Sequence, residues 1–296
     1  MANPHEIRNH IAAVEQTRKI TNAMEMVSST RMRRVIGHIA QNNLYFSYVR
    51  RAMKEILISS GGISHPYLNP REGKKPAFVV ISGDKGLCGP YNTNVLQLAR
   101  SRIESAPAYS LITVGIMAEA YFKEAGITPV ITGSGIAQDP SLHRIRGLVR
   151  EILPIYDEGL ADEIHVVYTS FLGATKNKPV EFQLLPIRLS DFDDVADARK
   201  LEDVRYHTSP QMVFDTLIPQ YIIGIMFGVA VQAYASEHYS RMNAMRSATI
   251  NADDMKKTLR IKYNLARQSA ITNEIAEISS AAEIIRKEDE LAYGQK

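Results

Sequence analysis

Cysteine is almost missing from this chain, in which Cys88 is the only one among 296 residues. A lone cysteine excludes an intramolecular disulfide and any zinc site built from several cysteines. The first residues, "MANPHEIRNH", have no apolar run after a basic start and carry acid early, so we expect neither a secretory signal nor a transit peptide. With 45% hydrophobic and 23% charged residues, the composition is that of a soluble globular protein, by default cytosolic.

Proline is absent between residues 7 and 56, and glycine occurs there once, at Gly37. Alternating steps of four and three from Ile7 to Ile56 meet fifteen positions, ten of them apolar, which is typical of a coiled-coil seam. The polar exceptions lie mostly between Arg18 and Ser28, within "KITNAMEMVSSTRMRRV". We therefore predict one long helix that ends near the glycines and proline of "SSGGISHP".

Residues 210–285 are also predicted to be helical, with Pro219 near the start. From residue 248 an apolar seam has a mean step of about 3.67 residues, which favours a nearly straight or slightly right-handed pairing. Its members are Ala248, Ala252, Met255, Leu259, Tyr263, Ala266 and Ala270. A second apolar stripe then follows, at Ile271, Ile275, Ile278, Ala282 and Ile285.

Helix length decides the expected architecture. At 1.5 Å per residue, the 66 residues after Pro219 span ~100 Å, whereas a compact chain of this size has a diameter of roughly 50 Å. The last helix should therefore protrude from the body. The first helix, at ~75 Å, is the only other element long enough to run beside it. We predict an antiparallel coiled coil made by the two ends of the chain.

The middle of the chain predicts alternating strands and helices. Short buried strands are expected at 76–82, 109–115, 127–132 and 162–171, with helices near 93–105, 117–125 and 141–153. This alternation is typical of a largely parallel sheet, and residues 179–187 read as an antiparallel edge strand. The predicted fold is a Rossmann-like α/β domain, inserted between two long N- and C-terminal helices that form an antiparallel coiled coil. Its segments are 1–60, 74–190 and 210–286.

No charged residue occurs between Asp215 and Glu237. This stretch is close to the ~20 apolar residues that cross a bilayer, and its Gly224 and Gly228 would pair helices in a membrane. It also contains Pro219 and glutamines, and no Lys or Arg cluster flanks it. We favour a buried helix of a soluble domain, with a membrane-anchored coiled-coil scaffold as the alternative.

Familiar catalytic motifs are absent. "SGDKGLCGPYN", residues 82–92, follows a strand but lacks the Gly-Lys-Ser/Thr of a phosphate loop. Cys88 has Gly86 before it and Pro90 after it, which is not a nucleophile elbow. "GSG" at 133–135 alone is weak support for a small nucleotide-binding enzyme, which we keep as a third class. We expect a tight turn with Cys88 as a small buried residue.

Positive charge gathers at the two ends. Residues 1–60 hold nine Lys and Arg against four Glu, and residues 237–270 hold seven against three acidic residues. Nucleic acid is one conceivable partner for such a surface. The basic residues are not interleaved with aromatic ones and no nucleic-acid motif is present, so we expect no nucleic acid and favour an acidic protein surface.

Three segments together resemble one family. "IRNHIAAVEQTRKITNAMEMVSSTRMRR" (7–34), "SGDKGLCGPYNTN" (82–94) and "ASEHYSRMNAMRSATINADDMKKTLRIKYNLARQSAITNEIAEI" (235–278) are similar to signatures of the gamma subunit of F-type ATP synthases. They occur in order and cover both ends and the middle of the chain. Asn22 stands where that family usually has Lys. The missing transit peptide and missing paired cysteines favour the bacterial type.

The resemblance implies a non-catalytic rotor shaft without a cofactor. It would stand inside a hexamer of alpha and beta subunits, rest with epsilon on the membrane ring of c subunits, and couple ion-driven rotation to ATP synthesis. It would be peripheral, on the cytoplasmic side of a bacterial membrane. The apolar tip, residues 271–285, would act as a bearing. Contacts to acidic loops of the beta subunits are implied at Met24, Arg31, Arg33, Arg34, Arg267, Gln268, Thr272 and Glu274.

Overall fold

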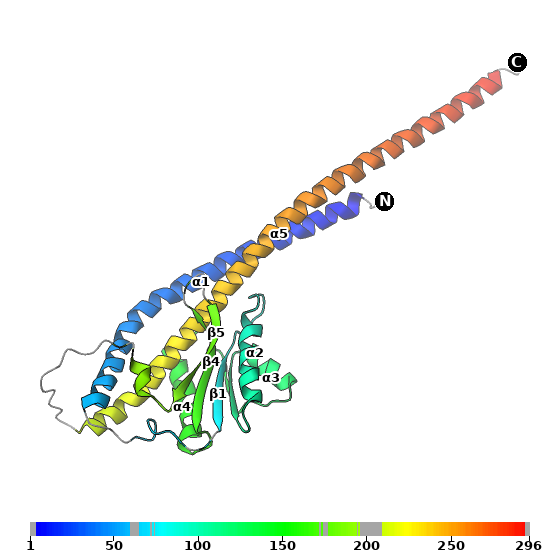
Figure 1. The fold of residues 1–296 in the computed structure, drawn as a ribbon. Coiled ribbons are helices and arrows are strands. Elements are labelled where there is room, and N and C mark those ends of the chain that lie inside the picture. The colour runs from blue at the N-terminus through cyan, green and yellow to red at the C-terminus, as the bar shows by residue number, and fades with distance from the viewer. Residues whose placement is uncertain are drawn as a thin grey trace. The chain divides into compact units, whose positions relative to one another are not determined.

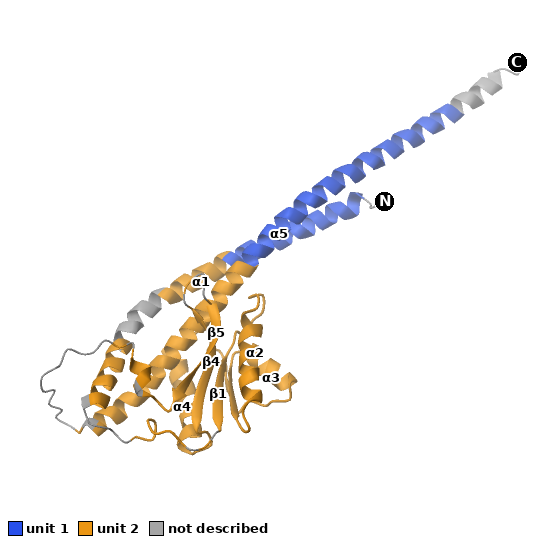
Figure 2. Ribbon diagram, in the orientation of Figure 1, with its two compact units in different colours: residues 1–25, 245–296 blue, residues 26–244 orange. Residues whose placement is uncertain are grey.

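A computed structural model describes most of the chain. It covers residues 4–59, 65–71, 73, 75–171, 173, 177–193, 195 and 209–293, without the side chains of 37–45, 59, 189, 210 and 285–293. The chain forms two compact units, one of residues 1–25 with 245–296 and the other of residues 26–244 (Figure 2). The long helices α1 (Pro4–Ser59) and α5 (Pro210–Tyr293) contribute to both units.

The unit of residues 26–244 is built on a five-stranded sheet in the order β3-β2-β1-β4-β5 (Figure 1). The first four strands are parallel and β5 is an antiparallel edge strand, as predicted. The strands are β1 (Pro76–Ile81), β2 (Ser110–Val114), β3 (Ile131–Gly133), β4 (Glu163–Phe171) and β5 (Asn177–Leu185). They are connected by α2 (Tyr91–Glu104), α3 (Ile116–Glu124) and α4 (Leu142–Asp157), and the 3-10 helix η1 (Leu189–Phe192) follows β5. The predicted α/β fold is confirmed.

The third strand is shorter than the predicted 127–132. Ile127 N donates to Phe122 O at 2.8 Å, which continues the end of α3. Val130 N then donates to Leu111 O of β2 at 2.8 Å, and regular pairing with β2 begins at Ile131. Because Ile127 closes the end of α3, only the last part of the apolar run pairs regularly with β2.

Both faces of the sheet are buried, because successive side chains of β1 point to opposite sides. Phe78 and Val80 pack with α2 and α3, whereas Ala77, Val79 and Ile81 pack with α4 and the two long helices. Because both faces of the sheet are covered, the central strands are apolar at nearly every position.

Residues of α5 between Phe214 and Ala233 belong to the larger of these cores. Phe214, Ile218 and Met226 are almost fully buried, and they pack in one cluster with Met53 and Ile56 of α1. One helix of the described residues, Gln211–Ile284, is long and apolar enough to cross a membrane, and half of its most apolar window is buried. The packing supports the buried-helix interpretation of the charge-free stretch.

The other unit pairs the start of α1 with α5 in antiparallel direction. Ile7 and Val14 of α1 pack with Ala252 and Leu259 of α5 in one apolar cluster. Four further pairs fix the register: Glu15–Lys256, Arg18–Asp253, Thr21–Thr249 and Glu25–Arg246. The predicted antiparallel coiled coil is confirmed by this pairing.

The expected seam of α5 needs a correction. Met255 is half exposed, at 50%, although it was expected in the seam. Ala270 is exposed as well, whereas the other five expected members are buried or half-buried. A heptad series among the buried or half-buried positions of α5 runs through Met245, Thr249, Ala252, Lys256, Leu259, Tyr263 and Ala266. Their spacing of about 3.5 residues is that of a left-handed coiled coil. The apolar pattern misled because Lys256 and Thr249 occupy seam positions through polar pairs with α1.

On α1, Ile7, Val14, Thr21 and Ser28 of the predicted seam are buried. Ile39 and Asn42 of that seam lie outside the described side chains. The secondary elements follow the three predicted segments, except that η1 ends at Phe192 and α5 continues to Tyr293. The standing of these segments as separate domains stays a prediction.

Candidate functional site

Polar pairs line the middle of the coiled-coil unit. Arg18 Nε donates to Asp253 Oδ1 at 2.6 Å, and the hydroxyls of Thr21 and Thr249 are 2.7 Å apart. The carboxylate of Glu15 accepts a hydrogen bond from Lys256 Nζ. This bond is the largest cause of the lowered pKa of the Glu15 carboxyl. Arg18 and Thr21 are polar positions that interrupt the apolar seam of α1, and bonds to α5 explain both interruptions.

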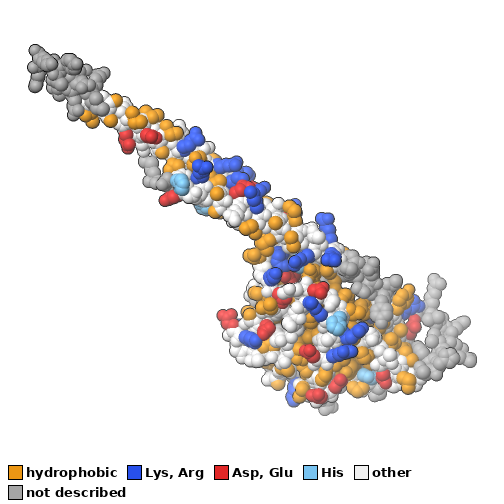
Figure 3. Space-filling model, turned by 180° about the vertical axis from the view of Figure 1, so that it is seen from behind, with side chains coloured by type: hydrophobic (Ala, Val, Ile, Leu, Met, Phe, Trp, Pro, Cys, Tyr) orange, Lys and Arg blue, Asp and Glu red, His pale blue; other side chains and the backbone are white. Residues whose placement is uncertain are grey.

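Beyond residue 270, α5 is exposed at every described side chain. Ile271, Ile275 and Ile278 are 45%, 62% and 64% exposed, which is unusual for so many isoleucines on one helix. Figure 3 shows hydrophobic side chains along this unit, with Lys and Arg among them. Such a surface is suited to being enclosed by other protein.

The predicted contact residues of α5 lie on the surface of the same unit. Arg267, Gln268, Thr272 and Glu274 are exposed, and Thr272 Oγ1 donates only locally, to Gln268 O at 2.9 Å. Met24, on α1, is half-buried. These side chains are therefore available to a partner.

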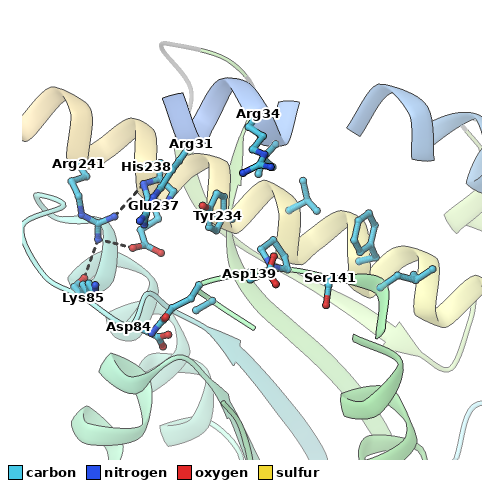
Figure 4. A pocket seen from close by; sticks show the side chains of 17 residues that line it. Arg31, Arg34, Asp84, Lys85, Asp139, Ser141, Tyr234, Glu237, His238 and Arg241 are labelled. Carbon is cyan, nitrogen blue, oxygen red and sulfur yellow. Dashed lines mark hydrogen bonds and ion pairs between the residues drawn. The ribbon is translucent and has the colours of Figure 1, made fainter. Parts of the chain in front are cut away.

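A buried charged cluster joins α5 to the loop after β1. Arg241 Nη2 donates to Glu237 Oε1 at 2.5 Å and to the carbonyls of Lys85 and Gly86, each at 3.3 Å (Figure 4). Glu237 and Arg241 are 5% and 7% exposed. A side chain at Gly83 would place its Cβ 2.8 Å from Glu237 Cδ, so glycine is needed there for the helix to approach the loop. The cluster fixes the loop to the helix.

Burial dominates the electrostatics of this cluster. Desolvation raises the pKa of Glu237 although Arg241 opposes it. Desolvation, followed by the positive charges of Arg241 and Arg31, lowers the pKa of His238 to about 3. His238 is therefore neutral at physiological pH, with its Nδ1 facing Arg241 Nη1 at 3.4 Å.

The loop itself gives no support to a thiol nucleophile. Cys88 is 1% exposed, and burial, the largest cause, raises the pKa of its thiol. Asn92 Nδ2 donates to Cys88 Sγ at 3.4 Å and to Lys85 O at 3.2 Å, while Asn92 Oδ1 accepts from Gly83 N at 2.9 Å. The expected tight turn with a buried Cys88 is confirmed, and its neighbour Leu87, at φ 59°, is the exposed tip.

A pocket of about 710 Å³ opens beside this cluster, within the unit of residues 26–244. Arg31 and Arg34 of α1 line it, together with Tyr234 and His238 of α5 (Figure 4). Arg33, the third predicted arginine, is exposed but does not line it. The structure thus brings two of the three arginines to one site.

Sequence reasoning missed Glu237, His238 and Arg241. A signal was present: Glu237 is the first charge after a charge-free stretch, and Arg241 follows at i+4, the spacing of a helical ion pair. Their burial against the loop after β1 could not be read from that spacing.

The comparisons with known proteins agree with this architecture. The family model described as ATP synthase matches residues 3–285. The ATP synthase gamma chain of Alkaliphilus metalliredigens is 36% identical over 95% of this chain and 98% of its own length. The chain belongs to the ATP synthase gamma chain family. The gamma chain of Pasteurella multocida is 33% identical over 96% of this chain and its full length.

Two solved structures of ATP synthases contain a chain with the same fold as this one. A chain of the Euglena gracilis mitochondrial ATP synthase, in its OSCP/F1/c-ring structure, has a TM-score of 0.67 at 19% identity, covering 95% of this chain and 94% of its own. A chain of the Tetrahymena thermophila mitochondrial ATP synthase central stalk and c ring has a TM-score of 0.58 at 20% identity, over 77% and 99%. Two long helices with an α/β domain are thus the gamma-chain fold.

Proposed function

We propose that this chain is the central rotor shaft of an F-type ATP synthase. As a gamma chain it is a non-catalytic component, which transmits rotation between a membrane ring and catalytic sites on other subunits. Membership of the gamma chain family over nearly the whole chain is the observation that carries the proposal.

The coiled-coil unit has the properties that a shaft requires. Torque passes between two helices only if they cannot slide, and the pairs Arg18–Asp253 and Thr21–Thr249 hold one register. Polar residues at seam positions specify register in coiled coils. The exposed apolar stripe at the end of α5 lacks the strong directional bonds that would trap one rotation angle by ~1.5–3 kcal/mol each.

The partners follow from the same role. The shaft would stand in a hexamer of alpha and beta subunits, with its α/β domain on the ring of c subunits together with epsilon. It would be peripheral to a bacterial membrane, on the cytoplasmic side, and held there by the complex. A buried α5 core, rather than a bilayer, accounts for the apolar stretch of the helix.

The proposed contacts to the beta subunits come from one group of side chains on α1 and another on α5. All of them are polar except one methionine, and all are exposed or half-buried. Their exposure supports the assignment, since none is committed to the core of either unit. The proposed contacts are Met24, Arg31, Arg33, Arg34, Arg267, Gln268, Thr272 and Glu274.

Co-purification tests the proposal. An affinity tag on this chain should recover two larger nucleotide-binding subunits from detergent-solubilised membranes of the native host. Alkaline carbonate should release the chain from those membranes, since it has no anchor of its own in this function. Recovery of the chain alone, or its retention in the carbonate pellet, would instead support a membrane-anchored scaffold.

A further inference from the structure

The pocket beside the Glu237–Arg241 cluster lies at the carboxyl edge of the parallel strands. Its walls include Asp84 and Lys85, which follow β1, and Asp139 and Ser141, which follow β3. Both strands are parallel, so both loops leave the carboxyl edge of the sheet. Ligands of open α/β sheets bind outside this edge, at the point where the strand order reverses. Here that point lies between β1 and β4, and the loop after β1 borders it. The volume of about 710 Å³ is that of a site for a small organic molecule.

Three kinds of donor line the pocket without a partner among the described residues. Arg31 and Arg34 make no hydrogen bond or ion pair there, and the hydroxyl of Ser141 makes none. His238, 4% exposed, presents Nε2 without a partner while its Nδ1 faces Arg241. Ser141 also precedes α4, a helix of 16 residues whose first amide groups attract anions.

Most carboxylate groups of the pocket have partners, although the buried Oδ2 of Asp84 has none among the described residues. Asp84 Oδ1 accepts from Ile116 N at 2.8 Å, and Glu237 is paired with Arg241. Asp139 lies 3.9 Å from Arg144. The pocket therefore has hydrogen-bond donors without partners, whereas several of its acceptors already have partners. This difference favours the binding of an anion.

We propose that this pocket binds a small phosphate-bearing molecule, with the phosphate between Arg31, Arg34 and the N-terminus of α4. Paired arginines suit phosphate because their planar forks donate bidentate bonds. The aromatic ring of Tyr234 and the remaining volume leave room for a nucleoside or similar group. Because Arg31 and Arg34 are also among the proposed beta-subunit contacts, a bound phosphate and a beta-subunit loop would compete for these two side chains.

Binding to the full-length chain tests the proposal, with inorganic pyrophosphate and ADP as probes. Isothermal titration should show saturable binding of either probe, and hydrogen exchange should slow at residues 137–146. Arg31→Gln and Arg34→Gln should each weaken binding about ten-fold or more. Ser141→Ala should weaken it less. Arg150→Gln removes the same charge from the exposed side of α4 and should leave affinity unchanged.

The two probes distinguish the sources of the phosphate. Tighter binding of ADP supports a nucleotide, and equal binding supports recognition of the phosphate group alone. Equal loss in all three arginine variants would show non-specific charge attraction and overturn the site. Binding of a peptide rich in Asp and Glu, with no binding of either phosphate probe, would overturn it in favour of a protein loop.

Discussion

Arg18 and Asp253 meet across the coiled coil, with Nε and Oδ1 2.6 Å apart, although 235 residues separate them in the sequence. Arg18 is one of the polar residues that interrupt the apolar seam of α1. The bond makes this polar position specify the register, because sliding the helices by one turn would separate Arg18 from Asp253.

Breaking this bond should weaken the pairing of the two ends. The side chains are 34% and 42% exposed, so solvent screening limits the coupling, and we expect Arg18→Ala and Asp253→Ala to interact by about 0.5–1 kcal/mol. A double-mutant cycle on the free energy of unfolding in urea measures this value. Arg260→Ala, on the exposed side of α5, is the control. Strict additivity of the two changes would contradict a register bond.

Arg241→Ala should be far more costly than changes at exposed arginines. It leaves the buried Glu237 carboxylate unpaired and frees the carbonyls of Lys85 and Gly86, which predicts a loss of about 3–5 kcal/mol in the free energy of unfolding. Arg246→Ala removes a pair at 3.9 Å with a 67% exposed side chain and should cost less than about 0.5 kcal/mol. Similar losses in both variants would mean that burial of the cluster contributes nothing.

His238 should make the protein less stable in acid. Its pKa is about 3 in the folded chain against 6.5 when unfolded, so its contribution is complete above pH 6.5 and is lost as the pH falls toward 3. Within that window the unfolded state binds the extra proton, at a cost to stability of up to about 1.4 kcal/mol per pH unit.

The measurement is the free energy of unfolding between pH 7 and pH 4, in the wild-type chain and in His238→Gln. The variant should show a shallower decline, whereas His143→Gln, at an exposed position, should follow the wild type. Identical slopes in the wild type and His238→Gln would contradict a neutral, buried imidazole.

The two glycines of the charge-free stretch should respond in opposite ways to alanine. A Cβ at Gly224 would lie 2.1 Å from the ring of Phe46, so Gly224→Ala should destabilise by about 1–3 kcal/mol through overpacking. At Gly228 nothing lies within 4 Å of the added Cβ, and Gly228→Ala should stabilise the helix by about 0.5–1 kcal/mol. Thermal unfolding of the two variants compares them directly, and a shift of the same sign would refute the packing of Phe46 on α5.

Met24→Lys tests the proposed contact with acidic loops. An added cation would form a charge-assisted bond of about 1.5–3 kcal/mol at one rotation angle, which would slow rotation about ten-fold or more. We expect the complex to assemble while ATP synthesis per transported ion falls. Ala23→Lys adds the same charge at an exposed neighbouring position and should have less effect. Unchanged coupling in Met24→Lys would count against a contact at this residue.

The exposed stripe at the end of α5 should control the solubility of the isolated chain. Replacing Ile271, Ile275 and Ile278 by serine removes exposed apolar surface and should shift the chain toward a monomer in size-exclusion chromatography. Stability should change little, since these side chains touch no core. A wild-type chain that is already a stable monomer would show that the stripe needs no partner.

The sequence by itself determined the architecture. Long stretches without proline, in which apolar residues recur with the helical period, predict helices. Strands that are apolar on both faces and alternate with helices predict a parallel sheet with helices on both faces. The residues 7–34, 82–94 and 235–278 carry the resemblance to the gamma chain family, which the relatives confirm. These features are local, so they can be read along the chain.

Only the tertiary structure decided which side chains meet. The seam of α5 runs through Lys256 rather than Met255 because Glu15 of the distant first helix receives the ammonium group. Arg31 and Arg34 reach a pocket that Arg33 does not, since α1 lies against the loops at the carboxyl edge of the sheet. Burial of Glu237 and His238 depends on the approach of α5 to Gly83. Each of these facts joins residues far apart in sequence, and periodicity carries no information about such pairs.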